Sequence, residues 1–159
     1  MPQHPTRRTL IAAGASALAL PALAQPQPSP APDGALAPNP AALRKAMADF
    51  TQGRQPLAQG LELDIPSLAD NPGSVPVKVK VTLPISEQDW CEEIIILADL
   101  NPAPLACRVQ FSTAAGTAEA AVRLRLAQSQ TVHALARMSS GKLLAARQPV
   151  TVIASGCGM

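Results

Sequence analysis

The chain has 159 residues, with 13 Lys and Arg against 11 Asp and Glu, and it contains one Trp, two Phe and no Tyr. This length suits a single domain. A nucleic-acid-binding protein is excluded, because the chain lacks both a basic patch for phosphates and aromatic side chains on which bases stack.

The first 24 residues have the parts of an export signal. Thr6-Arg7-Arg8 precedes an apolar run rich in Ala and Leu, which ends in Ala22-Leu23-Ala24. Such a sequence is typical of a signal peptide cleaved before Gln25, and the paired arginines indicate the twin-arginine (Tat) route. The apolar run is shorter than the roughly 20 residues that a membrane span requires, so we expect no membrane anchor.

Loss of residues 1–24 changes the charge of the chain. It removes two arginines and no acidic residue, which leaves 11 basic and 11 acidic residues and a net charge of zero. Residues 25–40 follow as a linker with six prolines among small residues, a composition typical of an extended spacer.

A short helix is predicted after the linker. Asn39 suits the N-cap, Pro40 suits the first helical position, and Gly53 ends the pattern. One helical face carries the apolar side chains of Leu43, Met47 and Phe50. We expect this face to pack against the core of a domain that spans residues 41–153.

From Leu61 onward the sequence predicts strands. Apolar and polar residues alternate in 75–83, 122–126 and 131–138, as in half-buried antiparallel strands, and the more continuous apolar run 90–97 indicates a central strand. About seven such segments, separated by turn residues, predict an all-β fold: an immunoglobulin-like antiparallel β-sandwich with a short N-terminal helix. Its last strand is predicted at 149–153.

Three cysteines, an odd number, leave one unpaired thiol in an exported protein. If 90–97 and 105–111 form a hairpin, Cys91 and Cys107 lie too far apart for a disulfide. We therefore favour two buried thiols at these positions over a disulfide between them.

The third cysteine lies in Gly156-Cys157-Gly158, within a predicted flexible C-terminal arm of residues 154–159. Gly156 and Gly158 leave the backbone around the thiol unrestricted. Four residues beyond Ile153 span about 13–14 Å, enough to cross a narrow pocket mouth. The pattern favours a covalent carrier thiol at Cys157. A tail with an incidental cysteine and a disulfide between two chains are the alternatives.

The same sequence disfavours catalysis by the chain itself. His133 is the one histidine left after cleavage, its place in the alternation predicts an outward side chain, and no motif orients it toward Cys157. A metal site is excluded because no cluster has ligand spacing, and no phosphate-binding loop is present. We expect no catalytic residues, no metal and no cofactor.

Two charged groups on the predicted strands are interpreted as surface. Asp89 and Glu92-Glu93 are expected to form a solvated acidic edge. Arg123, Arg125 and Arg137 are expected to form an outward basic stripe.

Several separated motifs together resemble the SoxY family, the sulfur carriers of the bacterial thiosulfate-oxidising (Sox) system. The resemblance runs from Ala41 to the C-terminus. The motifs are Leu63-Asp64-Ile65-Pro66, Ala69-Asp70-Asn71, Val75-Pro76-Val77, Ile96-Leu97-Ala98, Asn101-Pro102, 122–127, Ser129-Gln130-Thr131-Val132, and 150–153 leading to Gly156-Cys157-Gly158.

The resemblance implies a periplasmic, non-catalytic carrier. In this family the terminal cysteine holds sulfur intermediates, and the carrier forms a heterodimer with a second sandwich protein, SoxZ. A haem-containing enzyme joins thiosulfate to the thiol, a hydrolase releases sulfate, and in some organisms a molybdenum–haem enzyme oxidises the remaining sulfur. For this chain the resemblance places the attachment site at Cys157.

The ending departs from the family pattern Gly-Gly-Cys-Gly-Gly. Ser155 and Met159 stand at the outer positions, and Cys91 and Cys107 are extra. These departures leave an alternative: a SoxY-like carrier or binding module of another periplasmic pathway, such as one associated with a quinoprotein dehydrogenase.

Overall fold

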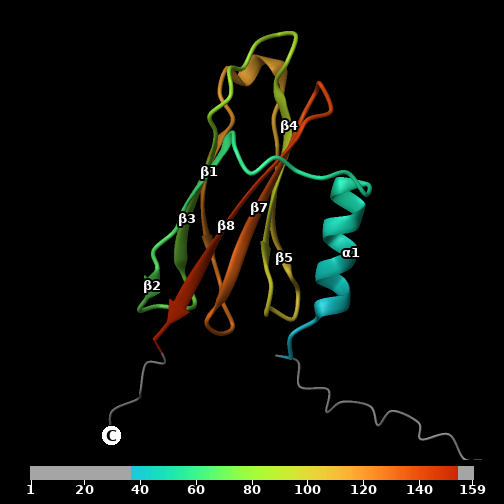
Figure 1. The fold of residues 1–159 in the computed structure, drawn as a ribbon. Coiled ribbons are helices and arrows are strands. Elements are labelled where there is room, and N and C mark those ends of the chain that lie inside the picture. Colours follow the sequence, from blue (N-terminus) through green and yellow to red (C-terminus); the bar gives the residue numbers. More distant parts are fainter. Residues whose placement is uncertain (1–36, 154–159) are drawn as a thin grey trace, which may run out of the picture. The chain divides into compact units, whose positions relative to one another are not determined.

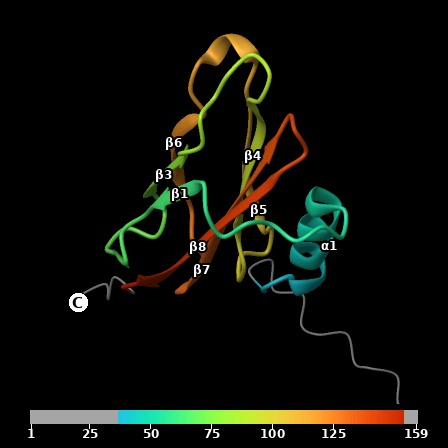
Figure 2. The same ribbon diagram turned by 45° about the horizontal axis from the view of Figure 1, so that its top comes forward.

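Two β-sheets stack face to face, and one helix covers the outer side of the larger sheet (Figures 1 and 2). The computed structural model describes residues 37–153. The predicted signal peptide, most of the linker and the arm lie outside the described residues. In the described part, the predicted immunoglobulin-like β-sandwich with a leading helix is confirmed.

The elements follow the chain in a simple order. The helical elements are α1 (Pro40–Thr51) and the 3₁₀ turn η1 (Thr113–Ala115). The three-stranded sheet has the order β1-β3-β6 and consists of β1 (Leu61–Asp64), β3 (Val75–Val81) and β6 (Glu119–Leu124). The five-stranded sheet has the order β2-β8-β7-β4-β5 and consists of β2 (Leu68–Ala69), β4 (Cys91–Ala98), β5 (Leu105–Gln110), β7 (Gln130–Met138) and β8 (Leu143–Val152).

The core lies between the two sheets and follows from the alternation of side chains along the strands. All four valines of β3 point inward and are buried. They belong to one apolar cluster with the inward side chains of β4 and β7, which include Ile94, Ile96, Val132 and Met138. Burial of these side chains on one face, with charged residues on the other, fixes the register of the strands.

A second, smaller cluster attaches α1 to the outer face of the five-stranded sheet. The Asn39 side chain accepts a hydrogen bond from the Ala42 amide at 3.0 Å, which caps the helix as predicted. Phe50 is 4% exposed and packs with Ile95, Leu97 and other apolar residues of the sheet. The predicted docking face is therefore confirmed, and it explains why β4 is apolar on both sides.

Because α1 packs on the five-stranded sheet, one prediction for β7 is wrong. Leu135 alternates with inward residues, so the sequence predicts that it faces solvent. It is 6% exposed because it packs under α1 with Phe50. The outer face of a strand faces solvent only where no other element covers it.

Two further differences concern strand number and length. β2 is a two-residue strand that pairs with β8 in parallel, an exception to the antiparallel pattern, and it is too short to show a periodicity. β8 begins at Leu143 rather than at 149, because it forms a hairpin with β7 through a tight turn in which Gly141 has a φ of 82°. Residues 143–146 are uniformly apolar, so they lack the alternation of apolar and polar residues that predicts a strand.

The cysteine geometry follows the predicted hairpin. β4 and β5 pair antiparallel, Cys107 lies opposite Ile96, and Cys91 is at the far end of β4. Both thiols are free. Cys91 is 1% exposed, and burial raises the pKa of its thiol to about 11. The expectation of two buried thiols is wrong for Cys107, which is only half-buried because β5 is an edge strand.

We predict that Phe50→Ala lowers the free energy of unfolding by about 3 kcal/mol, because it removes the largest apolar side chain from the contact between α1 and the sheet. Urea denaturation followed by circular dichroism measures the change. Arg44→Ala, an exposed position on the same helix, is the control and should change stability by less than about 0.5 kcal/mol. Equal stabilities of the two variants would contradict the docking of α1.

Candidate functional site

The candidate site is the end of the sandwich at which β8 finishes and the arm begins. Cys157, Gly156 and Gly158 lie outside the described residues. The structure describes the strand that leads to them as far as Ile153. We call this end, with the loops β2–β3, β4–β5 and β6–β7 that meet there, the arm-bearing end (Figure 1).

The backbone at the end of β8 is bound on both sides. On one side, the amides of Thr151 and Ile153 donate to the carbonyls of Ser67 (2.8 Å) and Ala69 (3.1 Å). On the other side, the amide of Val152 donates to the Ser129 hydroxyl at 2.9 Å. Consecutive amides therefore have partners in alternate directions. The last described residues of β8 are held in place up to the start of the arm.

A buried amide network positions the loop that carries Ser129. Gln130 is 6% exposed; its side chain donates to the Asn101 side-chain oxygen at 2.8 Å and accepts from the Leu100 amide at 2.9 Å. Asn101 also accepts from the Ala127 amide at 2.9 Å and donates to the Arg125 carbonyl at 2.8 Å. Because an unpaired buried amide is costly, this network holds the β4–β5 and β6–β7 loops in one arrangement.

In the sequence these residues belong to the motifs Asn101-Pro102 and Ser129-Gln130-Thr131-Val132. Asn101-Pro102 and Ser129 are typical of turns, and nothing in the local sequence indicates that the side chains of Asn101 and Gln130 meet. The structure brings them together across 29 positions of the chain. A glutamine at the first position of an apolar strand was the one available signal of a buried polar contact.

His133 lies on the outer face of β7, next to this network. Its side chain is 21% exposed, so the predicted outward orientation is correct but the side chain is half-buried. Its Nε2 lies 3.9 Å from the Asp99 carboxylate, which also accepts from the Thr131 amide at 3.0 Å. Burial lowers the pKa of His133; the Asp99 charge opposes this shift and Arg147 adds to it.

The expected acidic edge is wrong for Glu93. This residue is 6% exposed, and its carboxylate contacts Arg108 at 2.6 Å and Arg137 at 3.8 Å. It faces outward on β4, but α1 covers it. Glu92 is exposed as predicted.

The expected basic stripe is also divided. Arg123 and Arg125 are exposed at the three-stranded sheet and its exit loop. Arg137 is on the other sheet, where it donates to the Phe50 carbonyl at 2.9 Å, and its guanidinium carbon lies 4.5 Å from the centre of the Phe50 ring. Arg137 therefore belongs to the attachment of α1 and not to a surface stripe.

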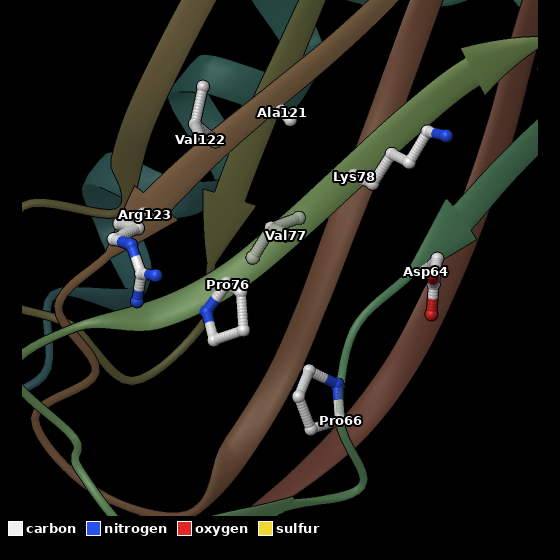
Figure 3. A pocket seen from close by; sticks show the side chains of 8 residues that line it. All are labelled: Asp64, Pro66, Pro76, Val77, Lys78, Ala121, Val122 and Arg123. Atoms are coloured by element: carbon white, nitrogen blue, oxygen red, sulfur yellow. The ribbon is translucent and has the colours of Figure 1, made fainter.

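The outer face of the three-stranded sheet has a shallow cavity of about 400 Å³ (Figure 3). Asp64, Lys78 and Arg123 line it from three neighbouring strands or their ends. Lys78 pairs with Glu119 at 2.7 Å, and this hydrogen bond raises the pKa of the lysine. Charges of both signs on an open surface indicate a solvated sheet face.

Residues 37–153 hold neither a metal-binding cluster nor a helix that could span a membrane. They contain no group of three or more His, Cys, Asp or Glu side chains that could hold a metal ion. They also contain no helix with the length and apolar character needed to cross a membrane.

The comparison with protein families gives a match over most of the chain. The model of the family described as "Sulfur oxidation protein SoxY" matches residues 47–157. No curated protein matches the chain. Among solved structures, the sulfur carrier protein SoxY from Chlorobium limicola f thiosulfatophilum has a TM-score of 0.58 and 23% identity, and the alignment covers 73% of this chain and 100% of that chain.

Superoxide reductases share the sandwich at lower identity. The enzyme from Ignicoccus hospitalis has a TM-score of 0.53 and 19% identity, with 60% of this chain and 81% of that chain covered. A putative superoxide reductase from Thermotoga maritima has a TM-score of 0.52 and 18% identity, with 67% and 92% covered. These likenesses extend to the fold alone.

We predict that Ser129→Ala loosens the end of β8. Loss of the bond to the Val152 amide removes about 1 kcal/mol, so local hydrogen exchange at this amide should become about fivefold faster. Ser67→Ala is the matched control, since Ser67 binds the other side of the strand through its backbone carbonyl, which the substitution keeps. Unchanged exchange at Val152 in Ser129→Ala would contradict this role.

We also predict a pH dependence of stability from His133. The folded chain binds a proton at His133 less readily than the unfolded chain does. The contribution of this group to the free energy of unfolding is therefore complete above the ordinary pKa of 6.5 and is lost as the pH falls below that value. Between pH 7 and pH 5 the free energy of unfolding, measured with urea, should therefore fall more for the wild type than for His133→Gln. Equal losses would show that His133 has no lowered pKa.

Proposed function

Because the chain belongs to the SoxY family, whose model matches residues 47–157, we propose that it is a non-catalytic sulfur carrier that holds thiosulfate-derived intermediates covalently on Cys157. The observation that carries the proposal is that the matched segment extends through the arm to this cysteine. It includes the whole sandwich and the strand from which the arm continues.

The proposed attachment is an oxidative step. The Cys157 thiolate forms a sulfur–sulfur bond with the terminal sulfur of thiosulfate, and the two electrons pass to a haem-containing partner enzyme. Attack of water on the sulfonate sulfur then breaks the bond to the sulfane sulfur, releases sulfate and two protons, and leaves a deprotonated persulfide on Cys157. The carrier supplies the sulfur atom of its cysteine and the position of the arm; partner enzymes supply the oxidant and the general acid–base groups.

The described geometry supports one part of this role, a fixed base from which the arm continues. The end of β8 is bound on both sides by Ala69 and Ser129, so the arm starts from a defined point. Residues beyond Ile153 can extend the thiol about 13–14 Å from it. Glycines on both sides of Cys157 let the backbone enter a narrow channel. The other two thiols lie on the sandwich itself, Cys91 in its core.

The proposal includes partners and a location. We place the mature chain in the periplasm after Tat export and cleavage of residues 1–24. A SoxZ-like subunit would form a heterodimer with it. A haem-containing enzyme, a hydrolase and a molybdenum enzyme of the Sox pathway would receive the arm in turn. The carrier needs no cofactor of its own for this role.

The C-terminal residues favour a second candidate function. Ser155 and Met159 replace glycines of the family pattern. A bulky thioether two residues after the thiol changes what a partner channel must admit. The alternative is therefore a SoxY-like carrier of another periplasmic pathway, such as one associated with a quinoprotein dehydrogenase.

We predict that Cys157→Ser abolishes thiosulfate oxidation by a reconstituted system of this chain, a SoxZ-like subunit and the partner enzymes. Mass spectrometry of the wild-type C-terminal peptide should show a thiosulfonate or persulfide adduct, which the variant cannot form. Cys107→Ser is the matched control and should keep both the activity and the adduct, because Cys107 faces the sandwich. Normal thiosulfate oxidation by Cys157→Ser would refute the carrier function. Adducts on Cys157 from another sulfur compound only would favour the second candidate.

A further inference from the structure

The strand β6 forms a free edge of the three-stranded sheet. Its residues pair with β3 on one side only. The Val81 amide donates to the Ala118 carbonyl at 2.9 Å, so the even-numbered residues of β6 direct their backbone N–H and C=O groups toward β3. The backbone groups of Glu119, Ala121 and Arg123 therefore point away from the sheet, and no strand within residues 37–153 pairs with them.

The other edges of the two sheets are protected against the addition of a further strand. β2 has two residues, and beside it β8 carries Pro149, which has no amide hydrogen. β1 has four residues and is followed by Pro66. The register of β5 shifts opposite Ile96 and Leu97, as in a bulge. By contrast, β6 has six residues in unbroken register with no proline. An edge without such protection indicates a surface that another strand covers.

The charged side chains of β6 complement those of an identical strand in antiparallel orientation. Glu119 and Arg123 lie on the same outer face, with the small side chain of Ala121 midway between them (Figure 3 shows Ala121 and Arg123). A two-fold axis at Ala121 places Glu119 of each copy opposite Arg123 of the other. Side chains that are directly opposite in an antiparallel pair lie close enough to form an ion pair. The edge is therefore self-complementary in charge.

The same register extends the charge pattern of the whole sheet. Glu62 lies opposite Lys80, and Lys80 lies opposite Glu119, whose carboxylate is 3.8 Å from the lysine Nζ. An arginine of a second copy beside Glu119 continues this row with a charge of alternate sign. On the inner face, the half-buried side chains of Val122 and Ala120 would lie opposite each other across the contact and cover apolar surface.

We propose that β6 pairs antiparallel with β6 of a second copy of this chain about a two-fold axis at Ala121, which joins two three-stranded sheets into one continuous sheet. β6 runs toward the arm-bearing end, because the β6–β7 loop that follows it binds the end of β8 there. Antiparallel pairing thus directs the two arms to opposite ends of the dimer, where two partner enzymes can use them independently. This use of the dimer rests on the proposed carrier function, whereas the pairing itself does not.

The first test is sedimentation of the purified chain, residues 25–159, at increasing concentration and with a reductant that prevents disulfides between chains. The contact is small, so we expect a weak dimer with a dissociation constant on the order of 100 µM. Hydrogen exchange then identifies the surface. Far above this concentration, the amides of Ala121 and Arg123 should exchange about tenfold more slowly than in dilute solution. The amides of Ala120 and Val122 bond to β3 and are the internal controls, which should not change.

Charge reversal tests the register of the contact. Arg123→Glu places two carboxylates opposite each other at both ends, and Glu119→Lys places two cations there, so each variant alone should dimerise at least about tenfold more weakly. A mixture of the two variants should regain wild-type affinity, because every charge then meets its opposite, and this recovery also shows that both variants fold. Arg44→Glu makes the same charge change as Arg123→Glu at an exposed position of α1, and this matched control should dimerise like the wild type.

Ala121→Pro tests the backbone pairing, since it removes an amide hydrogen that points away from β3, and it should abolish the dimer with the circular dichroism spectrum unchanged. A wild type that stays monomeric at millimolar concentration, or a variant mixture no stronger than its components, would overturn the inference. Protection of Ala121 and Arg123 only after addition of a different sandwich protein would also overturn it, in favour of a heterodimer at this edge. No thiosulfate and no reaction of Cys157 enter these measurements, so the pairing and the sulfur carriage can fail separately.

Discussion

The hydrogen bond between the side chains of Gln130 and Asn101 holds together the end of the sandwich at which β8 finishes. Asn101 lies in the β4–β5 loop and Gln130 is the first residue of β7, and each side chain also bonds backbone groups around it. Through them the β4–β5 and β6–β7 loops keep one arrangement. Ser129 is thereby placed against the end of β8. A packed apolar core alone would leave this end free to adopt several loop arrangements, because backbone groups in loops have no strand partners.

The helix α1 restricts where other proteins can bind. It covers one part of the outer face of the five-stranded sheet and ties it down with Phe50, Arg137 and, beneath them, Glu93. Within residues 37–153, no element covers the part of this face at the end of β8, where Leu68 and Ile153 are both about half exposed. These two apolar side chains would add contact surface for a partner of the kind proposed above.

The sequence predicts the elements that have a regular pattern of apolar residues or a capping signal. The alternation in β3 and β7 identifies the core valines and alanines, and Asn39 with Pro40 marks the start of α1. The sequence does not predict the buried state of Glu93 or Leu135, since both depend on a helix some 50 to 90 residues earlier in the chain. It also does not predict the amide network, because the bonding partners of Gln130 are set by loop geometry. The glycine neighbours of Cys157 identify the candidate thiol in the sequence, but the two-sided binding of the end of β8 becomes evident only from the fold.

The two-sided binding of β8 also has a mechanical consequence. A protein that pulls on the arm applies tension along the axis of β8, whose hydrogen bonds to β2 and β7 lie across that direction. Under such shear loading several bonds must rupture together, whereas a terminal strand pulled sideways would peel open one bond at a time. The sandwich is thus built to transmit a pull on its tail to the whole domain and to withstand it.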